Sequence, residues 1–124
     1  MKGRTLTIRL DADWQRALRR AGEKAKARRY QGEVLSFESP AIFFGQLTER
    51  RWELVRALQG REPATIRELA RHVGRDVKRV HEDVRVLIDL GLVERVEGGV
   101  TCPFVTVHID MELRAARALL PKAA

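Results

Sequence analysis

Two predicted helices joined by a turn of only about three residues are the feature that most constrains the fold of this chain. Thr65 begins the first helix, with Glu68 as the second member of a reciprocal capping box, and Gly74 ends it. Asp76 then caps a second, longer helix, which stops before Gly91. Because so short a turn holds two helices across one another, the segment is predicted to form a helix-turn-helix.

The flanking segments extend this pattern to about 60 residues. Upstream, Thr48 is the predicted cap of another helix, and Gly60 lies where its left-handed C-terminal cap belongs. The apolar face of that helix consists of Leu47, Leu54, Val55 and Leu58. Downstream, LVERVE, the pair Gly98-Gly99 and VTCPF predict a strand, a two-glycine turn and a second strand. Three capped helices followed by a hairpin predict a winged helix-turn-helix over residues 39–109, an α+β fold that is mainly α.

The last of these helices has one apolar face and one charged face. The residues expected to pack on the other helices are Val77, Val80, Val84, Leu87 and Ile88. The opposite face presents side chains that can reach phosphates and base edges in a major groove: Lys78, Arg79, Glu82 and Arg85. Glu82, Asp83 and Asp89 also bring negative charge, which lowers nonspecific affinity, and the alternative interpretation is a solvated face.

Other candidate nucleic-acid contacts lie around this face. Arg75 precedes the helix at the end that enters the groove. His81 lies at the boundary of the two faces, where it either contacts a base or is a packed or solvent-facing histidine. Arg67 and Arg71, on the exposed side of the preceding helix, suit backbone phosphates. Arg95, in the hairpin, could reach the backbone or the minor groove.

The N-terminal residues 1–38 predict a basic strand-helix-strand extension. RTLTIRL alternates as a half-buried strand does, a helix with a thin apolar face is expected through about residue 29, and VLSFES is a further strand. Ser39-Pro40 predicts the N-terminus of a short helix. At the other end, VTVHID either prolongs the second hairpin strand or starts another, and residues 110–124 predict a closing helix and tail.

Charge is concentrated at the N-terminus. The formal net charge is +7; residues 1–30 hold ten Lys and Arg against three acids, and the remaining residues balance to zero. A basic segment favours a polyanion, with nucleic acid first and a membrane surface or acidic protein second. The alternative interpretation of this segment is a solvated face. No apolar run approaches the roughly 20 residues that cross a bilayer, and the N-terminus does not resemble a signal peptide, so the expected location is cytoplasmic and nucleoid-associated.

The sequence contains no complete catalytic or metal-binding motif of a recognised kind. HEDVR at residues 81–85 begins like a zinc-protease motif but has Arg85 where the second histidine is needed. His72, the single Cys102 and His108 have no recognised ligand spacing, and no glycine-rich phosphate loop is present. We therefore expect no enzyme, metal or cofactor, and Cys102 to be a small buried side chain.

Residues 36–113, and above all TIRELARHVGRD and VHEDVRVLIDLGLVE, resemble the MarR-like winged-helix DNA-binding proteins of haloarchaeal type, which are antitoxin-like partners of TumE-type toxins. The stretches SFES and VTVHIDMEL are similar as well. The resemblance implies a dimeric regulator that controls its own operon and neutralises a small protein toxin. It places Arg75, Lys78, Arg79, His81 and Glu82 on the recognition helix.

The leading hypothesis is thus a sequence-specific regulator of double-stranded DNA that acts as a homodimer. A protein-interaction module is the alternative, since many winged helices bind proteins and the strand TLTIRL is expected to be an edge that another chain could extend. RNA binding through the basic N-terminal helix is a third hypothesis.

Overall fold

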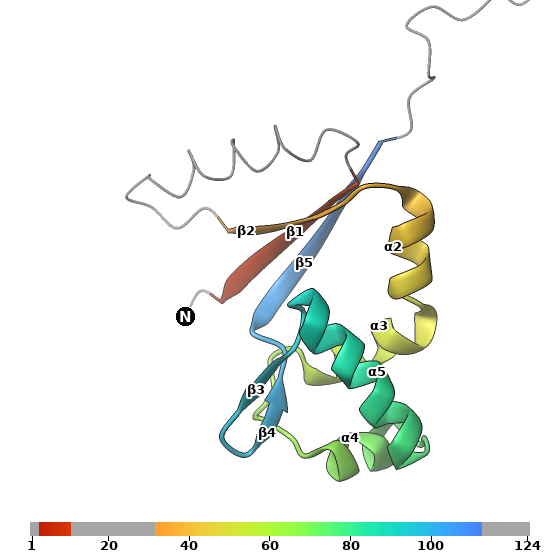
Figure 1. Ribbon diagram of the computed structural model, residues 1–124. Helices are drawn as coiled ribbons and strands as arrows, with labels where there is room; N and C mark the ends of the chain where they lie inside the picture. Colours follow the sequence, from red (N-terminus) through yellow and green to blue (C-terminus); the bar gives the residue numbers. More distant parts are fainter. Residues whose placement is uncertain (1–2, 11–31, 113–124) are drawn as a thin grey trace, which may run out of the picture.

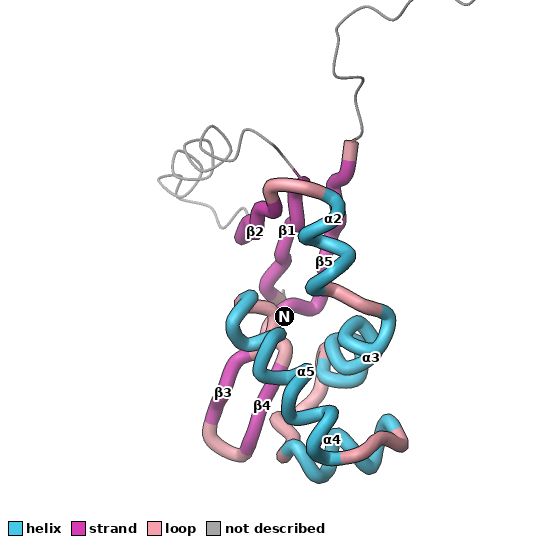
Figure 2. The backbone as a smooth tube through the Cα atoms, turned by 45° about the vertical axis from the view of Figure 1, so that its right-hand side comes forward, coloured by secondary structure: helices cyan, strands magenta, loops and turns pink. Residues whose placement is uncertain are grey.

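The computed structural model describes residues 3–10 and 32–112, which form an α+β fold. The chain order is β1 (Arg4–Leu10), β2 (Glu33–Phe37), α2 (Pro40–Gln46), α3 (Glu49–Leu58), α4 (Ile66–Val73), α5 (Val77–Leu90), β3 (Glu94–Val96), β4 (Gly99–Thr101) and β5 (Phe104–Met111). The predicted helix before residue 30 and the closing helix from residue 113 lie outside the described residues. A three-stranded sheet occupies one end of the fold, and α4 with the β3–β4 hairpin occupies the other (Figures 1 and 2).

The sheet has the order β2-β1-β5, and both pairings are parallel. The alternation predicted for RTLTIRL is confirmed, because Leu6 and Ile8 are buried. The expectation that this strand is an edge is wrong, since β1 is hydrogen-bonded on both sides. The segment VTVHID forms a strand of its own, β5, which continues to Met111 and therefore passes the expected boundary at residue 110. The sheet thus joins the N-terminal extension to the last strand after the hairpin.

Ion pairs neutralise part of the basic N-terminus. Arg4 Nη2 lies 2.6 Å from a carboxylate oxygen of Glu33, and Arg4 Nη1 lies 3.4 Å from one of Glu94 in β3. The hydrogen bond to Glu33 raises the pKa of Arg4 and, with the nearby charges of Glu33 and Glu94, outweighs the opposing effect of desolvation. Arg9 faces Asp110 across β1 and β5 at 3.5 Å. Arg4 therefore links the sheet to the hairpin, whereas Arg9 joins two strands within the sheet.

The predicted helix starts are confirmed by side-chain hydrogen bonds. Ser39, Thr48 and Asp76 each accept a bond from a backbone N–H of the first helical turn. Thr65 and Glu68 form both bonds of the capping box, Glu68 N to Thr65 Oγ1 at 3.1 Å and Thr65 N to a Glu68 carboxylate oxygen at 3.0 Å. These bonds satisfy N–H groups that have no partner inside the helix. Local chemistry therefore fixes where each described helix begins.

The helix ends follow the predicted glycines, with one difference. Gly74 and Gly91 are left-handed caps with φ of 70° and 90°. Helix α3, however, ends with Gln59 as an extended cap, and the left-handed Gly60 comes one residue later. The reason lies in the tertiary structure: Gln59 pairs with Cys102 and donates its side-chain amide to the Phe104 carbonyl at 3.1 Å.

The hairpin is present, but its turn is displaced by one residue from the predicted Gly98-Gly99. Val96 pairs with Gly99, so the turn consists of Glu97 and Gly98. Gly99 lies inside β4 because the strand approaches the loop before α4: a Cβ at Gly99 would lie 2.1 Å from the carbonyl oxygen of Ala64. Ala64 and Val100 exchange two backbone hydrogen bonds of 3.0 and 2.8 Å. The hairpin is thereby fixed to the helical part.

One apolar core connects the sheet, the helices and the hairpin. It is aliphatic apart from three phenylalanines and Cys102, and its most buried members include Ile8, Leu54, Val84, Leu87 and Val100. The face predicted for α5 is mostly confirmed, but Val77 is 43% exposed at the start of the helix. No helix in residues 3–10 and 32–112 has the length and apolar character needed to span a membrane.

Candidate nucleic-acid interface

Helix α4, the start of α5 and the hairpin lie together at the end of the molecule away from the three-stranded sheet (Figures 1 and 2). Gly74, Arg75 and Asp76 form the whole connection between the two helices. Leu69 and Ala70 of α4 and Val80 and Val84 of α5 are buried in the shared core. This packing leaves the other faces of both helices open to solvent.

The open faces are mainly basic. Every candidate residue except Arg75 is exposed: Arg67, Arg71, Lys78, Arg79, His81, Glu82, Arg85 and Arg95. Within the described part of the chain, none of the cations on α4 and α5 in this set forms an ion pair within 4 Å. Two nearby acids, Glu68 and Asp76, act as helix caps, and the backbone and side-chain bonds with Thr65 lower the pKa of Glu68. The acids on this surface that do not act as helix caps are Glu82 and Asp89.

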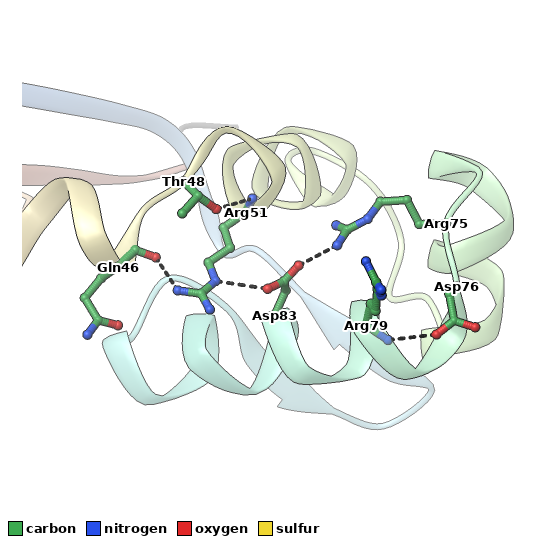
Figure 3. Close-up of polar contacts among 7 residues, drawn as sticks. All are labelled: Gln46, Thr48, Arg51, Arg75, Asp76, Arg79 and Asp83. Atoms are coloured by element: carbon green, nitrogen blue, oxygen red, sulfur yellow. Dashed lines mark hydrogen bonds and ion pairs between the residues drawn. The ribbon is translucent and has the colours of Figure 1, made fainter.

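Arg75 is placed differently from the expectation of a side chain that enters the groove. Its side chain is only 9% exposed, and Nη2 donates to Asp83 Oδ2 at 2.6 Å (Figure 3). Its Nη1 atom is buried and has no hydrogen-bond partner. The guanidinium is therefore held by Asp83 and largely shielded from solvent, which leaves little of Arg75 accessible to a ligand.

Asp83 is the residue that the sequence interpretation misplaced, as a negative charge on the exposed face. Its second oxygen, Oδ1, accepts a bond of 3.0 Å from Arg51 Nε in α3, and Arg51 Nη1 donates to the Gln46 carbonyl at 2.8 Å (Figure 3). Desolvation raises the pKa of Asp83, but the bonds from Arg75 and Arg51 outweigh it, and the pKa is lowered. A signal was available: Asp83 follows the buried Val80 by three residues and precedes the buried Leu87 by four. A carboxylate in that stripe requires a cationic partner.

A shallow groove of about 330 Å³ lies between α4 and the start of α5. Its lining residues are Arg67, Ala70, Arg71, Arg75 and Val77, with no acid among them. Two exposed guanidinium groups on its wall suit an anion such as a phosphodiester, because arginine can bind phosphate oxygens with two parallel bonds. The geometry is thus appropriate for a polyanion at this end of the molecule.

The other candidate sites in the described residues give weaker indications of a ligand. No group of three His, Cys, Asp or Glu residues in the described ranges is arranged to hold a metal ion. Cys102 is buried, and desolvation raises the pKa of its thiol. A groove of about 570 Å³ between α3 and α4 contains a contact of 3.3 Å between Arg61 Nη1 and His72 Nε2, but it is open and its lining mixes acids and bases.

Comparison with known families gives one result. Residues 46–109, just over half of the chain, match the family model HVO_A0114. The chain belongs to the HVO_A0114 family. All the candidate residues listed above, together with Arg51 and Asp83, lie in the HVO_A0114 region, whereas β1 and β2 lie outside it. Searches of curated proteins and of solved structures find no match to the chain.

Proposed function

We propose that this protein is a winged helix-turn-helix that binds double-stranded DNA and regulates transcription, without catalysing a reaction. The observation that carries the proposal is the basic surface of α4 and α5 beside a hairpin at one end of the fold, where the exposed cations form no ion pair with any other described residue. In helix-turn-helix proteins the second helix enters the major groove and the first crosses the backbone. Here α5 is the candidate recognition helix, and β3–β4 is the candidate wing.

The proposal gives each exposed residue a role according to its position. Arg67 and Arg71 on α4 bind backbone phosphates and fix the register of the protein on the duplex. Lys78 and Arg79 lie in the first turn of α5, the part that reaches furthest into a major groove. His81, Glu82 and Arg85 follow on the exposed side, and Arg95 reaches the backbone from the hairpin. Glu82 is suited to accept a bond from cytosine N4.

A fluorescence-anisotropy titration at several salt concentrations tests this function. The probes are the duplex upstream of the protein's own gene and a scrambled duplex of the same composition. We expect tighter binding to the upstream duplex and a steep loss of affinity with salt, because each neutralised phosphate releases counterions. Weak, salt-insensitive and equal binding to both duplexes would contradict the proposal.

Two neighbouring substitutions separate base contacts from phosphate contacts. Arg79→Ala is expected to lose roughly 1–3 kcal/mol on the preferred duplex and much less on the scrambled one, as for a base contact. Lys78→Ala is expected to weaken both duplexes alike, as for a phosphate contact. Equal losses on both duplexes for both variants would remove the assignment of base reading to Arg79.

Dimerisation and a toxin partner belong to the same proposal. One recognition helix reads few base pairs, so a homodimer on a palindromic site is the arrangement that gives high specificity. Light scattering of the free protein and of the DNA complex checks this, and a monomer in both would exclude it. The resemblance to antitoxin-like proteins adds the proposal that a small toxin binds this regulator, which co-purification with the product of the adjacent gene would test.

A protein-interaction module is the second candidate, and β5 favours it. This strand is at the edge of the sheet, and Val105 and Ile109 are 53% and 43% exposed. Beside them lies a groove of about 410 Å³ whose lining includes Trp52, Val55 and Val107. An open strand edge next to an apolar groove can accept an extended segment of another chain. Binding of a protein partner that is insensitive to salt and abolished by Val105→Lys would favour this candidate.

A further inference from the structure

The cluster of Arg51, Asp83 and Arg75 connects α3, α5 and the α4–α5 turn through one carboxylate, and through Arg51 it also reaches the end of α2. Asp83 projects from the middle of α5 and receives Arg51 of α3 on one oxygen and Arg75 of the α4–α5 turn on the other. Arg51 continues to the Gln46 carbonyl at the end of α2. Figure 3 shows the two guanidinium groups approaching Asp83 from opposite sides. The cluster is largely shielded, since the three side chains are 20%, 16% and 9% exposed for Arg51, Asp83 and Arg75.

We propose that this cluster sets the rotation and position of α5 on the rest of the fold, and that Asp83 and Arg75 are positioning residues for sequence discrimination that make no DNA contact themselves. The inference rests on the proposed function, because it assigns these residues a part in reading DNA. The inference also divides the basic residues of this region into two kinds: exposed residues that bind DNA, and Arg75, which positions α5.

The physical reason lies in the difference between apolar and polar packing. Val80, Val84 and Leu87 hold α5 in the core, but the hydrophobic effect is non-directional and constrains rotation weakly. Hydrogen bonds weaken steeply when their angle departs from linearity. A carboxylate held by two arginines from two directions therefore resists both rotation and sliding of the helix. Base contacts need placement to within about 0.5 Å, whereas flexible cations reach phosphates over a wider range of positions.

The burial of Arg75 is the reason to assign it a positioning role and not a contact with DNA. Its Nη1 atom is buried without a partner, and Nη2 is engaged by Asp83. Arg71, four residues earlier, is exposed and forms no ion pair within the described residues. The two arginines carry the same charge and line the same groove. They differ in accessibility, which makes Arg71 the matched control for Arg75.

The experiment compares Arg75→Met with Arg71→Met in the full chain. The specific probe is the best-bound duplex recovered from a random-sequence library by the wild-type protein, and the nonspecific probe is its scrambled form. Anisotropy titrations at several salt concentrations give two readouts: the ratio of the two affinities, and the slope of log affinity against log salt on the scrambled duplex. Thermal melting checks that each variant folds.

We expect Arg75→Met to lower the affinity ratio by about tenfold or more, the loss of one misplaced base contact, while the salt slope changes by less than half of the change in Arg71→Met. Arg71→Met is expected to reduce the slope by about 0.9, as for one lost phosphate contact. A slope change in Arg75→Met as large as in Arg71→Met, or an unchanged affinity ratio, would overturn the inference while leaving DNA binding intact.

Two other outcomes also have a defined consequence: a variant that does not fold, and a wild-type protein that does not bind DNA. If Arg75→Met does not melt cooperatively, Arg75→Lys replaces it, because lysine keeps the charge beside Asp83 but cannot reproduce the planar guanidinium geometry. The same criteria on ratio and slope then apply. A wild-type protein with no salt-dependent binding to any duplex would overturn the proposed function and this inference together.

Discussion

Replacing Asp83 with alanine is expected to destabilise the protein by about 2–4 kcal/mol. The variant removes the shared acceptor of Arg75 and Arg51, whose side chains are 9% and 20% exposed. Removing one partner of a fully buried ion pair costs about 3–5 kcal/mol, because the remaining charge is left uncompensated. We place the value lower because Arg51 keeps the Gln46 carbonyl and some access to water. Urea unfolding at pH 7 measures the change, with an unaltered m-value showing that the native state has stayed compact.

Asp89→Ala is the matched control for this prediction. Asp89 lies on the same helix, loses the same charge in the variant, and is exposed with no ion pair in the described part of the chain. A surface substitution of this kind should change stability by no more than about 0.5 kcal/mol. If Asp83→Ala and Asp89→Ala had equal effects, the cluster would contribute nothing to the fold, and the reasoning would be refuted.

Three further predictions concern pH, a helix cap and a glycine. The folded-state pKa of Asp83 is lowered. The stabilising effect of its carboxylate is therefore present above the unfolded-state pKa of about 3.9 and declines as pH falls through the folded-state pKa. The difference in unfolding free energy between wild type and Asp83→Ala should shrink below about pH 4, and a constant difference would contradict this prediction. Thr65→Ala should cost about 1 kcal/mol in urea unfolding, through loss of the capping box, and no change would show that the cap is dispensable. Gly99→Ala should cost at least about 2 kcal/mol more than Gly98→Ala: both glycines have positive φ, but only at Gly99 would the Cβ meet backbone, 2.1 Å from the Ala64 carbonyl oxygen.

Local signals predicted the helical part of the fold well. The caps at Thr48, Thr65 and Asp76 and the stops at Gly74 and Gly91 lie where the sequence indicates, because each depends on groups within one turn of the helix. The hairpin was also predictable, but not its register. The pair Gly98-Gly99 gives two candidate turns, and the choice depends on the approach of Ala64, which is distant in sequence.

The sheet and the polar cluster depended on contacts that a single sequence does not display. The strand pattern of RTLTIRL is local, but its position between β2 and β5 is set by partners about 27 and 100 residues away. The exposure of Arg75 was misjudged for the same reason. Its position before a helix suggests that the side chain is exposed to solvent, whereas in the fold it is largely buried and bonded to Asp83 of α5. The sequence offered one indication of this cluster, which is the carboxylate of Asp83 among the buried apolar residues of α5.

The most direct test of the proposed interface is the change in backbone amide NMR signals of the isotope-labelled protein when the upstream duplex is added at moderate salt. The account predicts that the largest changes fall on α4, the first turns of α5 and the β3–β4 hairpin, and that they vanish as salt is raised. Changes confined to β5 and the groove beside Trp52, or no changes at any salt concentration, would contradict a DNA interface formed by α4 and α5.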